Sequence, residues 1–486
     1  MVFSSHIFLF YFLPLVLLLN YTLPFRFLTT LLTAVSYIFY GWANPKWIVL
    51  MLTSTMVDYF CGLALVKFSG MPISKDGDLP FLPKETLRNR AQKMALFVSL
   101  FTNLAILGFF KYYDFGLESL NSLSTSFGGG ALPLPLIHVA LPIGISFYTF
   151  QSMSYAIDVY RGEARPLRHP ADFACFVALF PHQLAGPIIR YWSIAEQIRH
   201  RTFTWEKFAR GAALLCLGMG KKILLANPMG HIADTVFVAS AMHWYDAWFG
   251  VVSYAFQIYF DFSAYSDMAV GLALMLGFLF TKNFNDPYRA ESITDFWRRW
   301  HISLSTWLRD YLYIPLGGNQ KGEARTYFNL MTVMLLGGLW HGASWTFVIW
   351  GAIHGGMLGF ERALGKKSFY HRMPDLVKVA VTFAIVCISW VFFRAESLGS
   401  AWRFLLMMFS GPGAPEASII LGAVIYTKYH LLCFCACSVV VWFMPQAWNF
   451  TQRITPWKAG ACLTTFVISV MFLWTQTVNP FLYYQF

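Results

Sequence analysis

Charged residues are scarce in this chain. Asp, Glu, Lys and Arg make up 12% of its 486 residues, about half the usual share of roughly 25%. Hydrophobic residues make up 57%, and apolar runs that approach or exceed the length needed to cross a bilayer recur from end to end. The composition excludes an ordinary soluble domain. It predicts an all-α fold, a polytopic transmembrane helical bundle of roughly ten or eleven spans in a single domain over residues 1–486.

The motifs of several soluble enzymes are also absent. The chain has no Gly-x-Ser-x-Gly nucleophile elbow, no His-Glu-x-x-His zinc pair and no Walker-type lysine followed by Ser or Thr. Its eight cysteines form no framework, since Cys435 points away from the helix face that Cys433 and Cys437 share. We therefore expect no metal and no tightly bound cofactor, and neither a serine hydrolase, a zinc protease nor an ATP-driven pump.

Positive charge is concentrated in a few loops, although the net charge is +12. Residues 67–93 hold six Lys or Arg and residues 282–326 hold seven, whereas residues 227–243 hold none. Cytoplasmic loops collect Lys and Arg, which predicts that the two basic loops are cytoplasmic and the N-terminus periplasmic. The basic balance then indicates contact with acidic lipid headgroups and not with nucleic acid. The same topology places three further basic groups on the cytoplasmic side: Arg26, residues 161–168 and residues 190–210.

Two segments lie between basic flanks that are predicted to share one side of the membrane. Residues 171–190, which include His182, are too short to cross and return as two spans, so we predict a re-entrant segment there. Residues 327–361 are predicted to enter and return as a hairpin of two short helices. Small residues four apart allow close helix approach, although they also serve packing alone; the hairpin has such pairs at Gly338 and Gly342 and at Gly351 and Gly355.

His341 is the only ionisable side chain between Asn329 and Ile353. A titratable group at membrane depth is costly to place and is by default a candidate functional residue. It lies near the junction of the predicted hairpin, directly after Trp340. Imidazole has a pKa of about 6.5, and burial without a carboxylate partner lowers it. His341 is therefore expected to be neutral and able to accept a proton.

A Trp- and Arg-rich segment precedes the hairpin. Apolar residues from Phe296 to Tyr311 recur at spacings of three and four, which predicts one amphipathic helix from Ser292 to Leu312. Its composition suits the cytoplasmic membrane interface. His301 stands beside the apolar stripe and is the second candidate functional residue, although a histidine in such a place is more often satisfied structure.

The remaining candidates are supporting ones. Arg298, Arg299 and Arg309 suit the phosphates of a donor of the coenzyme A type, or form only an interfacial basic face. Other polar side chains occupy apolar or basic segments, where they would contact a histidine, line a passage or bind substrate: His182, Asp261, Asp267, Asp310 and His354.

The pairing of His301 on a Trp- and Arg-rich helix with Trp340-His341-Gly342 forty residues later resembles the membrane-bound O-acyltransferase family. The resemblance is to the bacterial branch that acetylates exported polysaccharides, and it covers nearly the whole chain. Further matching motifs are Leu141–Tyr148, Asp158–Gly162, Phe180–His182, Ala185–Pro187, Tyr259–Ser263, residues 1–5 and residues 480–486.

The resemblance implies a helical bundle with a tunnel in which His341, the catalytic residue, meets His301. It implies an O-acyltransferase of a bacterial inner membrane that moves acetyl groups from a cytoplasmic donor, acetyl-CoA, onto an exported polysaccharide such as alginate. The implied partners are the phospholipid bilayer, a periplasmic esterase-like acetyltransferase and a polysaccharide synthesis complex.

Acetyl transfer needs a base for the alcohol proton and stabilisation of a developing oxyanion. We predict His341 as the general base, with His301 polarising the thioester carbonyl or orienting the substrate. Two alternatives stay open. The same family chemistry acts on another acceptor, such as cellulose, a cell-wall polymer or a lipid. The other alternative is a transporter or channel in which His341, Asp261 and Asp267 form a proton or substrate path, although the chain shows none of the internal repeats common in transporters.

Overall fold

The computed structural model describes residues 1–72, 77–84, 86–130, 134–137, 139–365, 372–410, 415–476 and 481–482. All regular structure in these ranges is helical, which confirms the predicted all-α fold. The chain divides into two compact units. Unit 1 comprises Met1–Phe208 and Leu272–Thr281, and unit 2 comprises Ala209–Gly271 and Lys282–Phe486.

Unit 1 is built from apolar helices whose buried polar side chains form hydrogen bonds with one another. Asp58 accepts hydrogen bonds from Ser99 Oγ at 2.5 Å and from Asn103 Nδ2 at 2.8 and 3.0 Å. These contacts tie α3 to α4 and satisfy a carboxylate that would otherwise be costly to bury. The helices are η1 (Phe8–Phe12), α1 (Leu13–Thr22), α2 (Phe25–Gly41), α3 (Lys46–Lys67), α4 (Arg90–Ser126), α5 (Ile145–Arg161), α6 (Pro170–Ala178), α7 (Phe180–Gln183) and α8 (Tyr191–Arg199).

The predicted re-entrant segment is irregular and deeply buried. α6 ends at Ala178, Leu179 leaves helical geometry, and α7 adds only one turn. Every residue from Phe173 to Ile189 is buried within unit 1. Irregular backbone in such a chain requires enclosing protein, and the segment meets that requirement; its path relative to a bilayer stays a prediction.

Unit 2 contains the two candidate histidines. Its first elements are α9 (Trp205–Gly220), η2 (Lys221–Ala226), α10 (Asn227–Val238) and α11 (Trp244–Met275). The central elements are η3 (Pro287–Arg289), α12 (Ile293–Arg299), α13 (Ile302–Leu308), η4 (Arg309–Tyr313), α14 (Glu323–His341) and α15 (Trp345–Leu364). The last are α16 (Asp375–Arg394), α17 (Leu398–Phe409), α18 (Pro415–Ile425), α19 (Lys428–Phe443), α20 (Ala447–Phe450) and α21 (Pro456–Thr475). α9 and α11 each contribute residues to both units.

Several helices are long and apolar enough to cross a membrane. Among the described residues these are α3, α4, α16 and α21, and a fifth if α18 and α19, bent by 67°, count as one broken span. These helices indicate a multi-pass membrane protein. The larger number of spans and the orientation remain predictions.

The predicted single helix from Ser292 to Leu312 is wrong, because the helix breaks in its middle. α12 ends at Arg299, Trp300 is extended, and His301 adopts a left-handed conformation with φ of 42° before α13 begins. The expected start is confirmed, since Ser292 Oγ accepts from the backbone N–H of Asp295 at 3.0 Å. Periodicity did not reveal the break, because both halves keep their apolar residues on the buried side.

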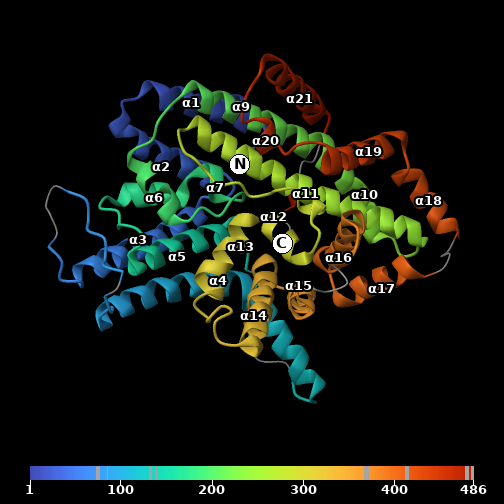
Figure 1. The fold of residues 1–486 in the computed structure, drawn as a ribbon, viewed down its shortest axis with the longest axis horizontal. Coiled ribbons are helices and arrows are strands. Elements are labelled where there is room, and N and C mark those ends of the chain that lie inside the picture. Colours follow the sequence, from blue (N-terminus) through green and yellow to red (C-terminus); the bar gives the residue numbers. More distant parts are fainter. Residues whose placement is uncertain are drawn as a thin grey trace. The chain divides into compact units, whose positions relative to one another are not determined.

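α14 and α15 form a close antiparallel hairpin, and Figure 1 shows them side by side. A Cβ on Gly338 would lie 2.3 Å from the carbonyl oxygen of Phe347. One on Gly351 would lie 2.4 Å from the carbonyl oxygen of Met334. The two backbones therefore approach directly, which only glycine permits at these positions. His341 ends α14 at the turn of this hairpin.

Candidate active site

His301 is fully buried and is held by a polar network on one edge of its ring. Its Nδ1 lies 3.2 Å from Asn283 Oδ1 and 3.4 Å from Ser303 Oγ. Asn283 Oδ1 also accepts from the backbone N–H of Ser303 at 3.2 Å and from its hydroxyl at 2.9 Å. Asn283 Nδ2 donates in turn to Ser266 Oγ at 3.0 Å.

This network assigns the tautomer of His301. A backbone N–H donates only to an acceptor, so the atom of Asn283 that faces Ser303 is the amide oxygen. The same oxygen faces Nδ1 of His301, which must therefore carry the proton and donate it. In the neutral ring, Nε2 then holds a lone pair, and it has no hydrogen-bond partner among the described residues.

Burial keeps this ring neutral. His301 lies outside the helices that are long and apolar enough to span a membrane, and desolvation by burial lowers its pKa to about 3. The lone pair on Nε2 is therefore present throughout the ordinary pH range. The left-handed backbone of His301 adds local strain of the kind that collects at functional sites.

His341 lies beside His301 at the end of α14. The two ring centroids are 6.5 Å apart, with planes at 61°. Trp340 borders both rings, at 6.0 Å from His301 and 5.0 Å from His341. Phe393 of α16 packs against His341 at 5.2 Å. The structure thus brings together Trp340, His341 and His301, which the sequence singled out.

Trp350 is a neighbour of His341 that the sequence argument missed. Its ring lies 5.2 Å from His341 at an angle of 84°, and it is completely buried. Its indole N–H makes no hydrogen bond to another described residue. A buried donor is normally satisfied, so this N–H is available to an acceptor beside His341. The only sequence feature that indicates this contact is the position of Trp350, nine residues after His341 in the same hairpin.

His354 is held in a different way from His301. Trp297 Nε1 donates to its Nδ1 at 3.2 Å, so its Nε2 must carry the proton. Nε2 lies 3.1 Å from Ser389 Oγ, which donates onward to the carbonyl of Val386 at 2.7 Å. Both ring nitrogens are therefore satisfied. His354 meets the ring of Trp350 at 4.8 Å, so it supports the aromatic wall beside His341.

Glu361 anchors the segment that carries His301. Its carboxylate, on α15, accepts from the backbone N–H groups of Ile293 at 2.6 Å and Thr294 at 2.9 Å. A carboxylate at a helix N-terminus is favoured by the exposed amides and by the helix dipole. This contact fixes the start of α12 against the hairpin, and the sequence argument did not identify it.

The arginine candidates lie at the surface of unit 2. Arg298 is exposed, Arg299 pairs with Asp295 at 2.8 Å, and Arg309 pairs with Asp310 at 2.7 Å. The structure does not bring these side chains to the two histidines. Their role toward a donor stays a prediction, as does that of Asp310.

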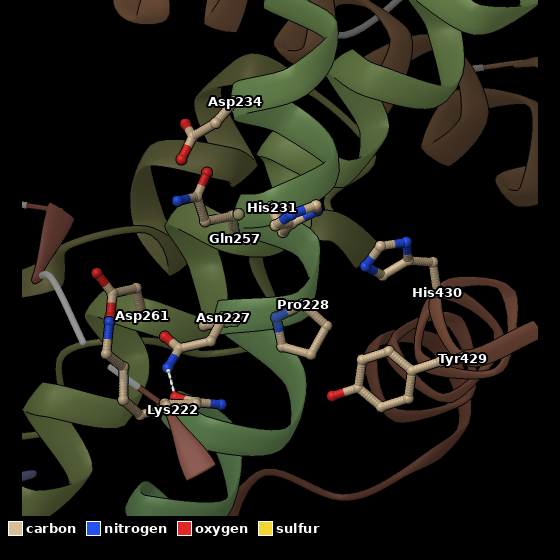
Figure 2. Close-up of a pocket in the computed structure, with 12 residues that line it drawn as sticks. Lys222, Asn227, Pro228, His231, Asp234, Gln257, Asp261, Tyr429 and His430 are labelled. Atoms are coloured by element: carbon tan, nitrogen blue, oxygen red, sulfur yellow. Dashed lines mark hydrogen bonds and ion pairs between the residues drawn. The ribbon is translucent and has the colours of Figure 1, made fainter. Parts of the chain in front are cut away.

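Asp261 lines a pocket of about 370 Å³ in unit 2. It pairs with Lys222 Nζ at 2.6 Å and accepts from the backbone N–H of Leu482 at 2.7 Å. Figure 2 shows this pair at one end of the pocket and Asp234 at the other, with His231 between them and His430 of α19 facing His231. Asp267, another acid of α11, pairs with Lys221 at 2.6 Å.

His182 belongs to unit 1, whereas His301 and His341 belong to unit 2. Its Nδ1 lies 2.6 Å from Gln151 Nε2. Its Nε2 is buried and has no hydrogen-bond partner among the described residues.

The chain belongs to the membrane-bound O-acyltransferase family, whose model matches residues 160–402. This range contains both histidines and the polar network of Asn283. The family and its members define an acyltransferase of the membrane.

Two relatives extend the likeness to the whole chain, and a third covers most of it. "Probable alginate O-acetylase AlgI" of Azotobacter vinelandii is 43% identical over 100% of both chains. The protein of the same name from Pseudomonas aeruginosa strain PAO1 is 48% identical over 84% of this chain and 75% of its own. The "Peptidoglycan O-acetyltransferase" of Helicobacter pylori is 32% identical over 100% of this chain and 98% of its own.

Proposed function

We propose that this protein transfers acetyl groups from a cytoplasmic thioester, acetyl-CoA, across a bacterial inner membrane for O-acetylation of an exported polysaccharide such as alginate. The observation that carries the proposal is the juxtaposition of His301 and His341 at a ring-centroid distance of 6.5 Å inside unit 2. The relatives named for alginate O-acetylation support the choice of acceptor class.

The reaction requires one proton transfer and one acyl transfer. A base removes the proton of the acceptor hydroxyl, the oxygen attacks the thioester carbonyl carbon, the C–S bond breaks, and the thiolate takes up the proton. His341 is the proposed general base. The attacking hydroxyl has one proton, which His341 takes. The lone pair of His301 Nε2 therefore accepts a hydrogen bond from a neighbouring hydroxyl of the same sugar, and in this way we assign His301 to orient the acceptor.

The tautomer of His301 distinguishes between its two expected roles, polarising the thioester carbonyl and orienting the substrate. Polarising a carbonyl requires a donor, but Nδ1–H of His301 is held by Asn283 and Nε2 is an acceptor. Of the two roles expected for His301, orienting the substrate fits this arrangement. The indole N–H of Trp350 is the donor that we assign to the developing oxyanion, because it is buried, has no acceptor among the described residues and lies beside His341.

The partners belong to the same proposal. We infer a periplasmic esterase-like acetyltransferase and a polysaccharide synthesis complex that receive the acetyl group, with the N-terminus on the periplasmic side. An acceptor other than alginate is the second candidate, since a full-length relative is named for peptidoglycan O-acetylation.

Purified full-length protein in liposomes tests the enzyme assignment. Release of free coenzyme A from acetyl-CoA in the presence of acceptor should fall by about 10²–10⁴ in His341→Ala. Trp350→Phe keeps the ring and loses the donor, so it should lower kcat by about 10²–10³. His243→Ala, a partly exposed histidine in the turn before α11, is the matched control and should retain wild-type activity.

Acetyl content of the exported polymer in a deletion strain identifies the acceptor. Loss of polymer acetylation that returns with the wild-type gene supports the proposal. A correctly inserted His341→Ala protein that restores full acetylation contradicts it, and so does a strain in which only peptidoglycan loses acetyl groups, which favours the second candidate.

A further inference from the structure

The pocket that Asp261 lines is a polar site whose residues the transfer mechanism does not use. Its volume of about 370 Å³ falls in the range of about 300–1,000 Å³ of small-molecule sites. Its walls come from η2, α10, α11, α19 and Gln476, and all twelve residues drawn in Figure 2 belong to unit 2. They include neither His301 nor His341.

The charges of the pocket are compensated within the chain. Among the residues drawn in Figure 2, the charged ones are Lys222, Asp234 and Asp261. Lys222 Nζ lies 2.6 Å from Asp261 Oδ1, and Asp234 Oδ1 lies 2.7 Å from Nη2 of Arg394. Lys222 and Asp261 are both buried, so either charge would be costly without the other. These residues therefore leave no net charge to select an ion, which favours a ligand held by neutral hydrogen bonds.

Side-chain amides supply such hydrogen bonds. Oε1 of Gln257 is buried and has no hydrogen-bond partner among the described residues. The amide lies close against α10, because a Cβ on Gly230 would be 2.7 Å from its Nε2. A second amide pair borders the pocket, where Asn227 Nδ2 donates to Gln476 Oε1 at 2.6 Å. An amide both donates and accepts, which matches a hydroxyl group.

Two stacked histidines form another part of the wall. The rings of His231 on α10 and His430 on α19 are 5.1 Å apart, with planes at 27°. Nδ1 of His430 lies 3.1 Å from the carbonyl oxygen of Val424 and must donate to it, so Nε2 of the neutral ring is an acceptor. The described residues contain no group of three metal-ligating side chains. The two imidazoles therefore act here as hydrogen-bonding groups.

Tyr429 adds an exposed aromatic ring to this polar lining. Its side chain is 43% exposed and lies beside His430, at a ring-centroid distance of 5.7 Å. Figure 2 shows both rings projecting from α19 toward α10. A sugar ring carries hydroxyls at its edge and apolar C–H groups on its faces. An aromatic ring next to neutral amides offers a surface for each.

The predicted topology places this pocket on the side of the exported polymer. α10 contains no Lys or Arg, which predicts that it lies toward the periplasm. α11 contributes to both sites of unit 2. Its Gln257 and Asp261 line the pocket, while its Phe262 meets the ring of His301 at 4.7 Å.

We propose that this pocket binds a sugar unit of the exported polymer, with Gln257 and Tyr429 as its principal contacts. Gln257 forms hydrogen bonds with ring hydroxyls, and Tyr429 packs against a C–H face. Two sources have this chemistry: a uronate polymer such as alginate and a neutral glucan. The choice of an exported polymer rests on the proposed function, whereas binding itself requires no acetyl transfer.

Isothermal titration calorimetry of the full-length protein in lipid nanodiscs tests the site, because detergents with sugar headgroups would compete. The probes are a mannuronate hexasaccharide, cellohexaose, and hexaethylene glycol as a chain with hydroxyls only at its ends. We expect saturable binding of at least one oligosaccharide and no binding of hexaethylene glycol. Gln257→Leu should weaken binding by about tenfold, because both the donor and the acceptor of the amide are lost.

Tyr429→Leu removes the aromatic face and should weaken binding as well. Tyr245→Leu is its matched control. Tyr245 is 45% exposed and stacks on His243 at 5.0 Å, but it is not among the residues drawn in Figure 2, so this variant should bind as the wild type does. Gly230→Ala keeps Gln257 and displaces its amide; it should weaken binding without removing a polar group.

Binding of the mannuronate alone assigns the site to a uronate polymer, and binding of cellohexaose alone assigns it to a neutral glucan; either result, or binding of both, supports the proposal. Failure of both oligosaccharides to bind overturns it. Unchanged binding in both Gln257→Leu and Tyr429→Leu overturns it too, as does an equal loss in Tyr245→Leu or equal binding of hexaethylene glycol. Since no donor is present, a protein that binds the oligosaccharide but releases no coenzyme A from acetyl-CoA contradicts the proposed function and not this site.

Discussion

Asn283 Oδ1 lies 3.2 Å from Nδ1 of His301 and at the same distance from the backbone N–H of Ser303. One amide oxygen accepts from both donors. The backbone N–H of Ser303 therefore fixes the orientation of the Asn283 amide, and the amide fixes which nitrogen of His301 carries the proton. The break after α12 places the backbone N–H of Ser303 beside Asn283, so the backbone path indirectly determines that Nε2 of His301 has the lone pair. Asn283 is a positioning residue in this arrangement, since it acts through His301.

Asn283→Leu should remove the tautomer control without changing charge. We expect kcat to fall by about 10–100-fold, as when an outer-shell partner that orients a histidine is lost, with little change in KM. Asn283→Asp keeps an acceptor and adds a carboxylate, which raises the pKa of His301. The acidic limb of its pH–rate profile should therefore move to higher pH than in the wild type. A Leu variant with normal kcat contradicts the positioning role.

The burial of His301 predicts a pH dependence of stability. Its pKa is about 3 in the folded protein, whereas an unfolded histidine has a pKa of about 6.5. Below pH 6.5 the unfolded state therefore binds a proton that the folded state does not, and the free energy of unfolding decreases until the pH approaches 3. Above pH 6.5 this group contributes no slope.

Thermal unfolding of His301→Gln in detergent measures this effect. The variant should show a shallower fall of Tm between pH 6.5 and 4 than the wild type, and the same slope above pH 7. Identical slopes below pH 6.5 would show that His301 does not remain neutral in the folded protein.

The hairpin of α14 and α15 predicts a contrast between two glycines on one helix. Gly351→Ala places a methyl group 2.4 Å from the carbonyl oxygen of Met334, so the two backbones must separate. We expect a loss of about 1–3 kcal/mol in stability and reduced activity, since His341 ends α14. Gly356→Ala meets nothing within 4 Å and should be neutral or slightly stabilising, because alanine favours a helix. Limited proteolysis and coenzyme A release measure both quantities, and equal behaviour of the two variants would contradict the close approach.

The all-α class and the family followed from the sequence because they depend on local properties. Apolar runs predict membrane helices wherever the residues pack, and the isolation of His341 among apolar residues marks it without any contact being known. The resemblance assigned His301 to the active site. It did not predict the residues that surround its ring. Periodicity extended a helix through it, because the burial pattern of two short helices continues across a break of two residues.

Which nitrogen of His301 holds a proton, which arginines are paired and which glycines let helices touch were decided only by tertiary structure. Asn283 lies 18 residues before His301 and Ser389 lies 35 residues after His354, so no local pattern links them. Hydrogen bonds act over about 3 Å in space, and the chain brings these partners together only after its helices pack. Sequence alone therefore determined which side chains were candidates, and packing determined what each of them can donate or accept.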